Sequence, residues 1–187
     1  MPSSYSGDLK LELMVTGEKA GLWGDITNTN LNIVQQAIAG YEAVSIAGGA
    51  QTTALDFSNG VISNGKNAVI VLSGTITGNQ IVTIPDSIEK NYTIKNGTTG
   101  TFTVEFKTVS GTGTTWSTTD KGTKFLYSDG TNIVDVNADI NTINQYTLPV
   151  SDGTSGQAML TDGSGTLSFG EAGISTGKAI AMAIVFG

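Results

Sequence analysis

The sequence predicts a mainly β protein: a sandwich-like β domain with a short N-terminal helix and an extended, oligomerising C-terminal β region. Short apolar stretches recur at regular intervals between turn-forming dipeptides, a pattern typical of sandwiches and small barrels. Gly, Ser, Thr and Asn make up roughly four residues in ten, as expected for a chain rich in turns. Charged residues make up only 13%, about half the usual share.

One helix is predicted, near residues 29–39. The polar residues 27–30 offer N-caps, and Gly40 is a natural C-terminal stop. The spacing of the apolar residues favours a helical stripe, formed by Leu31, Val34 and Ile38 and widened by Ile33 and Ala37. Because a short helix with one apolar face is unstable alone, it must pack against the rest of the chain or against another chain.

The region 41–137 is predicted to form the sandwich-like domain. Its candidate strands are Thr52–Phe57, Ala68–Leu72, Gln80–Ile84, Tyr92–Lys95, Phe102–Lys107, Lys124–Tyr127 and Ile133–Val136. Predicted turns between them include Asn59-Gly60, Asn64-Gly65, Ser73-Gly74, Asn96-Gly97 and Asp129-Gly130. Alternation over 101–107 predicts that Phe102, Val104 and Phe106 face the core. Gly111-Thr112-Gly113 is interpreted as a flexible loop.

The region 138–187 has too few apolar residues for a core of its own, which predicts self-association. It ends in Ala179–Phe186, apolar at every position, which indicates a strand buried on both faces. The predicted interface between chains is therefore Ile180, Met182, Ile184, Val185 and Phe186. The run is too short to span a bilayer as a helix, so no membrane insertion is expected.

The composition points away from an enzyme and from bound cofactors. The chain contains no histidine, cysteine or arginine, which removes the usual proton shuttle, thiol nucleophile and anion-binding fork. Asp135–Asn141 resembles a calcium loop, but Ile140 and Tyr146 stand where an EF-hand needs Gly and Glu. No catalytic residue, cofactor or metal site is therefore predicted.

Charge and the N-terminus limit the expected partners and location. The net charge of −7, without a lysine cluster, disfavours nucleic acids and anionic membranes. The N-terminus has no signal-peptide pattern, so synthesis in the cytosol is expected.

Two tryptophans are the candidate binding residues. Trp116 lies in a Gly/Thr-rich polar stretch where it would stack on a sugar or a partner chain. The alternative, which we favour, is that its ring folds back over an edge of the sandwich. Trp23 is predicted to hold the N-terminal loop against a docking partner.

Several segments resemble bacteriophage tail fibre and fibre-like virion proteins, particularly those of marine and cyanobacterial phages. They are Leu9–Leu13, the Thr16-Gly17-Glu18 to Leu31 stretch with Ala20-Gly21 and Trp23-Gly24, Asn67–Gly74, Ile94–Asn96, Tyr127–Asn132, Leu148–Gln157 and Thr161-Asp162-Gly163. The resemblance thus covers most of the chain.

This resemblance implies a structural virion component, a short tail fibre or fibre adaptor located in the tail or another appendage and assembled in the host cytoplasm. Residues 1–40 would be a virion-attachment segment bound to tail or baseplate proteins, and 138–187 an oligomerisation region, with a homotrimer expected. The large distal domain of long tail fibres is not found before Gly187. The alternatives are a glycan-binding module that recognises a host receptor and, less favoured, a tailspike-type polysaccharide hydrolase.

Overall fold

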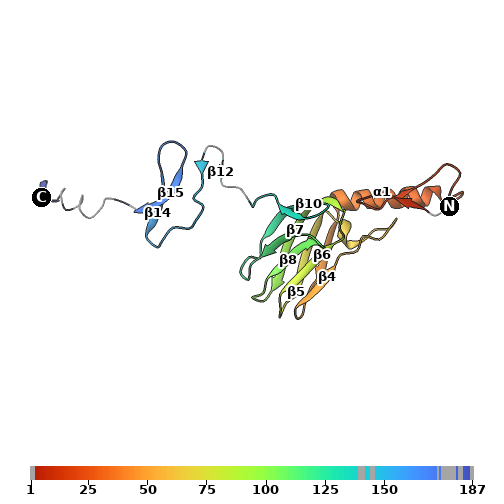
Figure 1. The fold of residues 1–187 in the computed structure, drawn as a ribbon, viewed down its shortest axis with the longest axis horizontal. Coiled ribbons are helices and arrows are strands. Elements are labelled where there is room, and N and C mark those ends of the chain that lie inside the picture. Colours follow the sequence, from red (N-terminus) through yellow and green to blue (C-terminus); the bar gives the residue numbers. More distant parts are fainter. Residues whose placement is uncertain are drawn as a thin grey trace. The chain divides into compact units, whose positions relative to one another are not determined.

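A computed structural model describes residues 3–138, 142–143, 146–171, 173, 180 and 183–185. The chain divides into two compact units, 1–137 and 138–187, which we describe separately. Strands dominate both units and one long helix lies in the first, so the predicted mainly β fold is confirmed (Figure 1).

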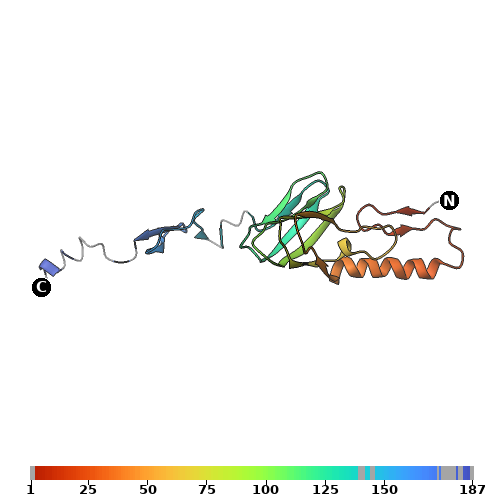
Figure 2. The ribbon, with the colours of Figure 1, turned by 90° about the horizontal axis from the view of Figure 1, so that it is seen from below.

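The first unit opens with a small antiparallel pair, β1 (Ser4–Tyr5) and β2 (Glu12–Leu13), followed by α1 (Trp23–Ala39). Asn30 joins the helix to β2, since its side chain accepts from the Glu12 N–H at 3.0 Å and donates to the Glu12 carbonyl at 2.9 Å. Figure 2 shows α1 and this pair extending beyond the sheets, which the helix meets at its C-terminal end.

The helix begins six residues earlier than the sequence predicted, so the expected N-caps lie inside it. Leu22 occupies the N-cap position and makes no side-chain capping bond. Thr27 instead donates from Oγ1 to the Trp23 carbonyl, 2.8 Å away. Such bonding back into the preceding turn lets a polar residue lie inside a helix, and it explains why the capping signal was misleading.

Two sheets form the rest of this unit. The five-stranded sheet has the order β11-β10-β7-β5-β3 and the four-stranded sheet β4-β6-β8-β9. The strands are β3 (Tyr41–Ser45), β4 (Gln51–Ala54), β5 (Val69–Thr75), β6 (Gln80–Ile84), β7 (Glu89–Thr99), β8 (Val104–Thr108), β9 (Gly113–Trp116), β10 (Thr123–Asp129) and β11 (Ile133–Asp135).

The chain winds between the two sheets instead of forming successive hairpins. The strands β3, β5 and β7 pair in parallel in one sheet, and β4, β6 and β8 pair in parallel in the other. Each winding therefore contributes one strand to each sheet, as in a short β-helix. The antiparallel strands β9, β10 and β11 then complete the two sheets.

This winding explains why two of the predicted turns are wrong. Ser73-Gly74 lies within β5, and Asn96-Gly97 lies within β7. Asn96 is fully buried; its Oδ1 accepts from the N–H and hydroxyl of Thr98, and its Nδ2 donates to the Asp120 carbonyl. Asp129-Gly130, by contrast, links β10 to β11, a true antiparallel hairpin.

The core lies between the two sheets and is built from alternate residues of their strands. Val104 and Phe106 are fully buried and Phe102 packs against the cluster, as predicted. The Tyr92 and Phe106 rings, one from each sheet, meet edge to face with centroids 5.5 Å apart. The large side chains of the core include Ile46, Ile70, Leu72, Ile84, Ile94, Phe106, Trp116 and Leu126.

The described part of the second unit contains two small antiparallel strand pairs. One joins β12 (Thr142–Ile143) to β13 (Tyr146–Thr147), and the other joins β14 (Gln157–Thr161) to β15 (Leu167–Glu171). None of the residues 146–171 is buried, and Val150, Met159 and Leu160 are exposed.

The apolar C-terminal run was predicted to be a strand, but its described residues, 180 and 183–185, are helical. The alanines that alternate through 179–183 favour a helix over a strand, because alanine has the highest helix propensity. Ile180, Ile184 and Val185 are exposed within the single chain. Met182 and Phe186 lie outside the described residues.

Candidate functional site

The interpretation of Trp116 as a sugar-stacking residue is wrong. Trp116 ends β9 with 0% of its surface exposed, and its indole N–H donates to the Gly122 carbonyl at 3.0 Å. A ring without exposed surface cannot stack on a ligand. The favoured alternative, in which the ring covers the sandwich, agrees with this burial.

Trp23 begins α1 and exposes 63% of its surface. Its ring is accessible to a partner, as the docking prediction requires. It lies on a different element from Trp116, so the two tryptophans do not form a common site.

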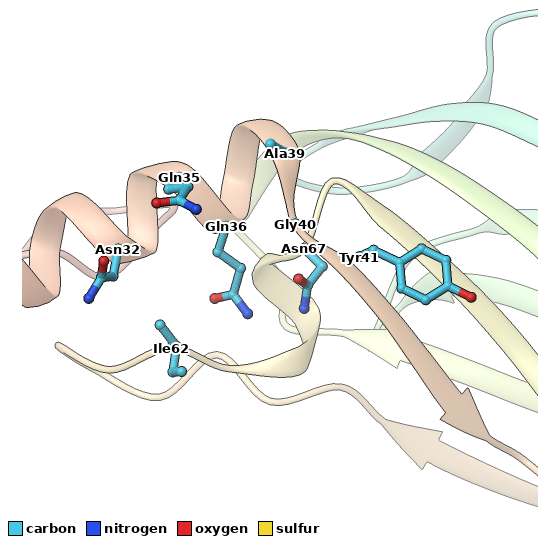
Figure 3. Close-up of a pocket in the computed structure, with 8 residues that line it drawn as sticks. All are labelled: Asn32, Gln35, Gln36, Ala39, Gly40, Tyr41, Ile62 and Asn67. Carbon is cyan, nitrogen blue, oxygen red and sulfur yellow. The ribbon is translucent and has the colours of Figure 1, made fainter.

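A shallow pocket of about 330 Å³ lies where α1 ends and β3 begins (Figure 3). It is lined by Asn32, Gln35, Gln36, Ala39, Gly40, Tyr41, Ile62 and Asn67. Figure 3 shows Gln36 and Asn67 between the helix and the loop that carries Ile62, with the Tyr41 ring directed away from the helix. Sequence reasoning missed this pocket, because its residues come from segments that carry no common motif.

Close packing fixes the floor of the pocket. A Cβ on Gly40 would lie 2.3 Å from the Gln36 carbonyl oxygen and 2.4 Å from Oδ1 of Asn67, so only glycine fits there. Gln36 accepts the Ser63 N–H through Oε1 at 3.2 Å, and Asn67 donates from Nδ2 to the Asn64 carbonyl at 3.0 Å. These two amides are therefore held in place by the loop beneath them.

The chemistry of the pocket is neutral and polar. Asn32 and Gln35 present exposed amides, and Tyr41 adds an exposed aromatic ring. Amides paired with an aromatic ring suit a neutral ligand with several hydroxyl groups, since the amides both donate and accept while the ring stacks.

Lys66 supports the loop beneath the pocket. It is fully buried, and its Nζ donates to the carbonyls of Ser58 and Val61 at 2.7 and 2.6 Å. Burial lowers the pKa of Lys66 below its usual value. Its ammonium group is thus used to fix the loop, and nothing in its sequence context indicates this role.

Lys90 acts in the same region. Its Nζ donates to the Asn67 carbonyl at 2.9 Å and lies 4.2 Å from the centroid of the Tyr92 ring. Burial lowers the pKa of Lys90 to about 8. Tyr92 donates in turn to the Gly65 carbonyl at 3.2 Å, so both side chains tie the loop to the core.

The carboxylates serve local structure. Two backbone N–H groups, those of Asn132 and Thr131, lower the pKa of Asp129 in the β10–β11 turn. In the segment examined for calcium binding, Asp135 pairs with Lys124 at 3.0 Å through Oδ2 and accepts the Asn137 N–H through Oδ1. Within the described part of the chain, no three acidic residues gather into a group able to hold a metal ion.

Comparison with known proteins gives no relative on which to base a function: no family model matches the chain, and neither curated proteins nor solved structures match it significantly. The described helices include none that is both long and apolar enough to cross a membrane.

Proposed function

We propose that this chain is a structural component of a bacteriophage virion, a short tail fibre or fibre adaptor that assembles as a homo-oligomer and supports host attachment. In this role it is not an enzyme. Its first unit is the folded body, residues 1–40 bind other tail or baseplate proteins, and the second unit contributes to assembly.

The observation that carries the proposal is the contrast between the two units. The first has a continuous core between two sheets, whereas β13, β14 and β15 of the second bury no side chain. Such short strand pairs are marginal in water, so the second unit needs the same unit of other copies to bury Met159, Leu160 and the C-terminal run. A fibre-like homo-oligomer, expected to be a trimer, supplies this burial.

Immunogold labelling of the parent virion tests the proposal. An antibody against this chain should label the tail or another appendage in negative-stain images. Virions that carry no label on tail or appendage would contradict it.

Deletion of residues 178–187 tests the second unit's part in assembly. We expect light scattering to report loss of the oligomer, or aggregation, while circular dichroism shows the first unit still folded. An oligomer whose mass and dissociation constant are both unchanged would contradict this contact.

A glycan-binding module is the second candidate, and the pocket beside Tyr41 favours it. A glycan array with the purified protein should then give signals that Tyr41→Ala and Gln35→Ala both abolish. Val109→Ala is the control, because Val109 is exposed and does not line the pocket. Binding that survives both pocket substitutions would assign the glycan site elsewhere.

A further inference from the structure

The helix α1 carries a mostly apolar seam that the described part of the first unit leaves largely uncovered. Thr27, Leu31, Val34 and Ile38 follow one another at spacings of four, three and four residues, the pattern of a coiled-coil seam. Leu31 exposes 61% of its surface and Ile38 75%, and Ile33 is the one buried residue that α1 contributes. Of the stripe that the sequence predicted to need a packing partner, Leu31 and Ile38 are therefore exposed, Val34 and Ala37 are half-buried, and Ile33 is buried.

The outer face of the five-stranded sheet carries a second apolar row. Strand register aligns Tyr41, Val69, Thr93 and Phe125 across β3, β5, β7 and β10, and Val136 follows through the bond from its N–H to the Phe125 carbonyl. Phe125 exposes 54% of its surface and Val136 56%, and Tyr41 is also exposed.

The seam and the row form one continuous surface. Ile38, the last seam residue, lines a groove of about 430 Å³ together with Thr93, Phe125 and Val136. Apolar surface of this extent, on the order of 600 Å², lies at the upper end of what a monomer exposes, and patches of that size commonly serve an interaction.

The opposite face of the same unit differs. The corresponding row of the four-stranded sheet contains Thr52, Ile81, Glu105 and Thr115, so polar residues flank a half-buried isoleucine. The apolar surface is thus specific to the side of the unit where α1 meets the five-stranded sheet.

We propose that this surface is an interface between copies of this chain, in which α1 helices pack in parallel along the seam Thr27–Leu31–Val34–Ile38 and the five-stranded sheets face one another around Phe125. The proposal rests on the proposed function only in taking the partner to be another copy. It is a contact separate from the one expected in the second unit.

The charge and the area of this apolar surface favour another copy of the chain as its binding partner. Identical faces can meet only where like charges do not oppose, and α1 contains a single charged residue, Asp25, outside the seam. The aligned sheet row contains no charged residue, and Lys95, exposed two positions along β7 from Thr93, lies beside it. The large apolar side chains of the surface expose on the order of 600 Å², close to the roughly 800 Å² per partner of a standard interface.

The position of Ile38 sets the direction of packing. Because the seam runs into the sheet row at one end of α1, parallel copies cover the seam and the row together. Antiparallel copies would cover the seam and leave Phe125 and Val136 in water. The β1–β2 pair is bound to the helix through Asn30, which is not a seam residue, and it stays free to contact other virion proteins.

Charge substitutions in the full chain test the interface. The double variant Leu31→Glu with Ile38→Glu and the single variant Phe125→Glu should each raise the dissociation constant of the oligomer at least tenfold, measured by sedimentation equilibrium. Val109→Glu is the matched control, since this exposed valine lies outside the surface, and it should leave the constant unchanged. Circular dichroism checks that each variant is folded.

A single cysteine tests the direction, because the chain has no cysteine of its own. Under mild oxidation, Ile38→Cys should form a disulfide between copies, and Val109→Cys should not. A monomeric wild type, or an oligomer that the Leu31, Ile38 and Phe125 substitutions leave intact, would overturn the proposal. So would a folded oligomeric Ile38→Cys protein that does not cross-link. Virion labelling decides the proposed function separately from all of these outcomes.

Discussion

Replacing Trp116 with alanine should destabilise the first unit severely. The ring is fully buried and closes the core beside Val104, its cross-strand partner. Removing a buried aromatic side chain costs about 3–5 kcal/mol, and the loss of the indole N–H adds little, because the Gly122 carbonyl keeps the Asn96 N–H as a donor. The total is comparable with the whole free energy of unfolding of many domains, about 5–15 kcal/mol.

Urea unfolding followed by far-ultraviolet circular dichroism at fixed protein concentration measures this loss. With a denaturant slope of about 2 kcal/mol per molar, the midpoint should fall by about 2 M. Trp116→Phe retains most of the ring, so its loss should be smaller than that of alanine.

Trp23→Ala is the matched control, because it removes the same side chain from an exposed position. Its free energy of unfolding should change by no more than about 0.5 kcal/mol. The assignment of Trp116 to the core would be refuted if its alanine variant lost less than about 1 kcal/mol, or if the two alanine variants lost equal amounts.

Three further outcomes are expected from the same unfolding assay. Gly111→Ala should lower the free energy of unfolding by at least about 2 kcal/mol, because its Cβ would overlap the Thr131 carbonyl oxygen. Gly49→Ala is the control and should be nearly neutral, since no atom lies within 4 Å of its Cβ. Equal losses of stability in the two variants would contradict the reasoning. Since Lys90 has a folded-state pKa of about 8, below its value in the unfolded chain, folding releases protons and stability should rise by on the order of 1 kcal/mol from pH 8 to 9.5. Lys90→Met should reduce this rise in stability with pH. If the slope of stability against pH were unchanged in the variant, the rise would come from other titrating groups. Calcium or a chelator should leave the midpoint unchanged, since both carboxylate oxygens of Asp135 are already bonded, and a calcium-dependent shift would show that a site exists.

The strands that alternation marked clearly were predictable from the sequence. The range Gln80–Ile84 matches β6, and the core positions of Val104 and Phe106 follow from the two-residue period. Such patterns report local burial, which each segment encodes by itself. The strands β3 and β9 were missed, because Tyr41 and the glycines near Trp116 gave no clear alternation.

The parallel winding was not predictable, because the stacked positions hold unlike residues. Val44, Leu72 and Asn96 occupy one column across three strands, so no repeat is visible in the sequence. The winding also gives glycine a different structural role at these positions. Gly97 does not shape a hairpin turn. It follows a buried asparagine in the interior of β7, where a Cβ would lie 3.2 Å from the Leu72 carbonyl oxygen.

The candidate pocket and the apolar surface both arise where α1 joins the sheets, and neither is local in sequence. The pocket needs Gly40 to bring the helix end against Asn67, and the surface needs register to align Phe125 with Thr93 and Tyr41. The apolar stripe of α1, however, was visible in the sequence as a face in need of a partner. Within the first unit, the chain covers Ile33 and leaves Leu31 and Ile38 exposed, and we propose as their partner another copy, whose α1 presents the same uncharged seam.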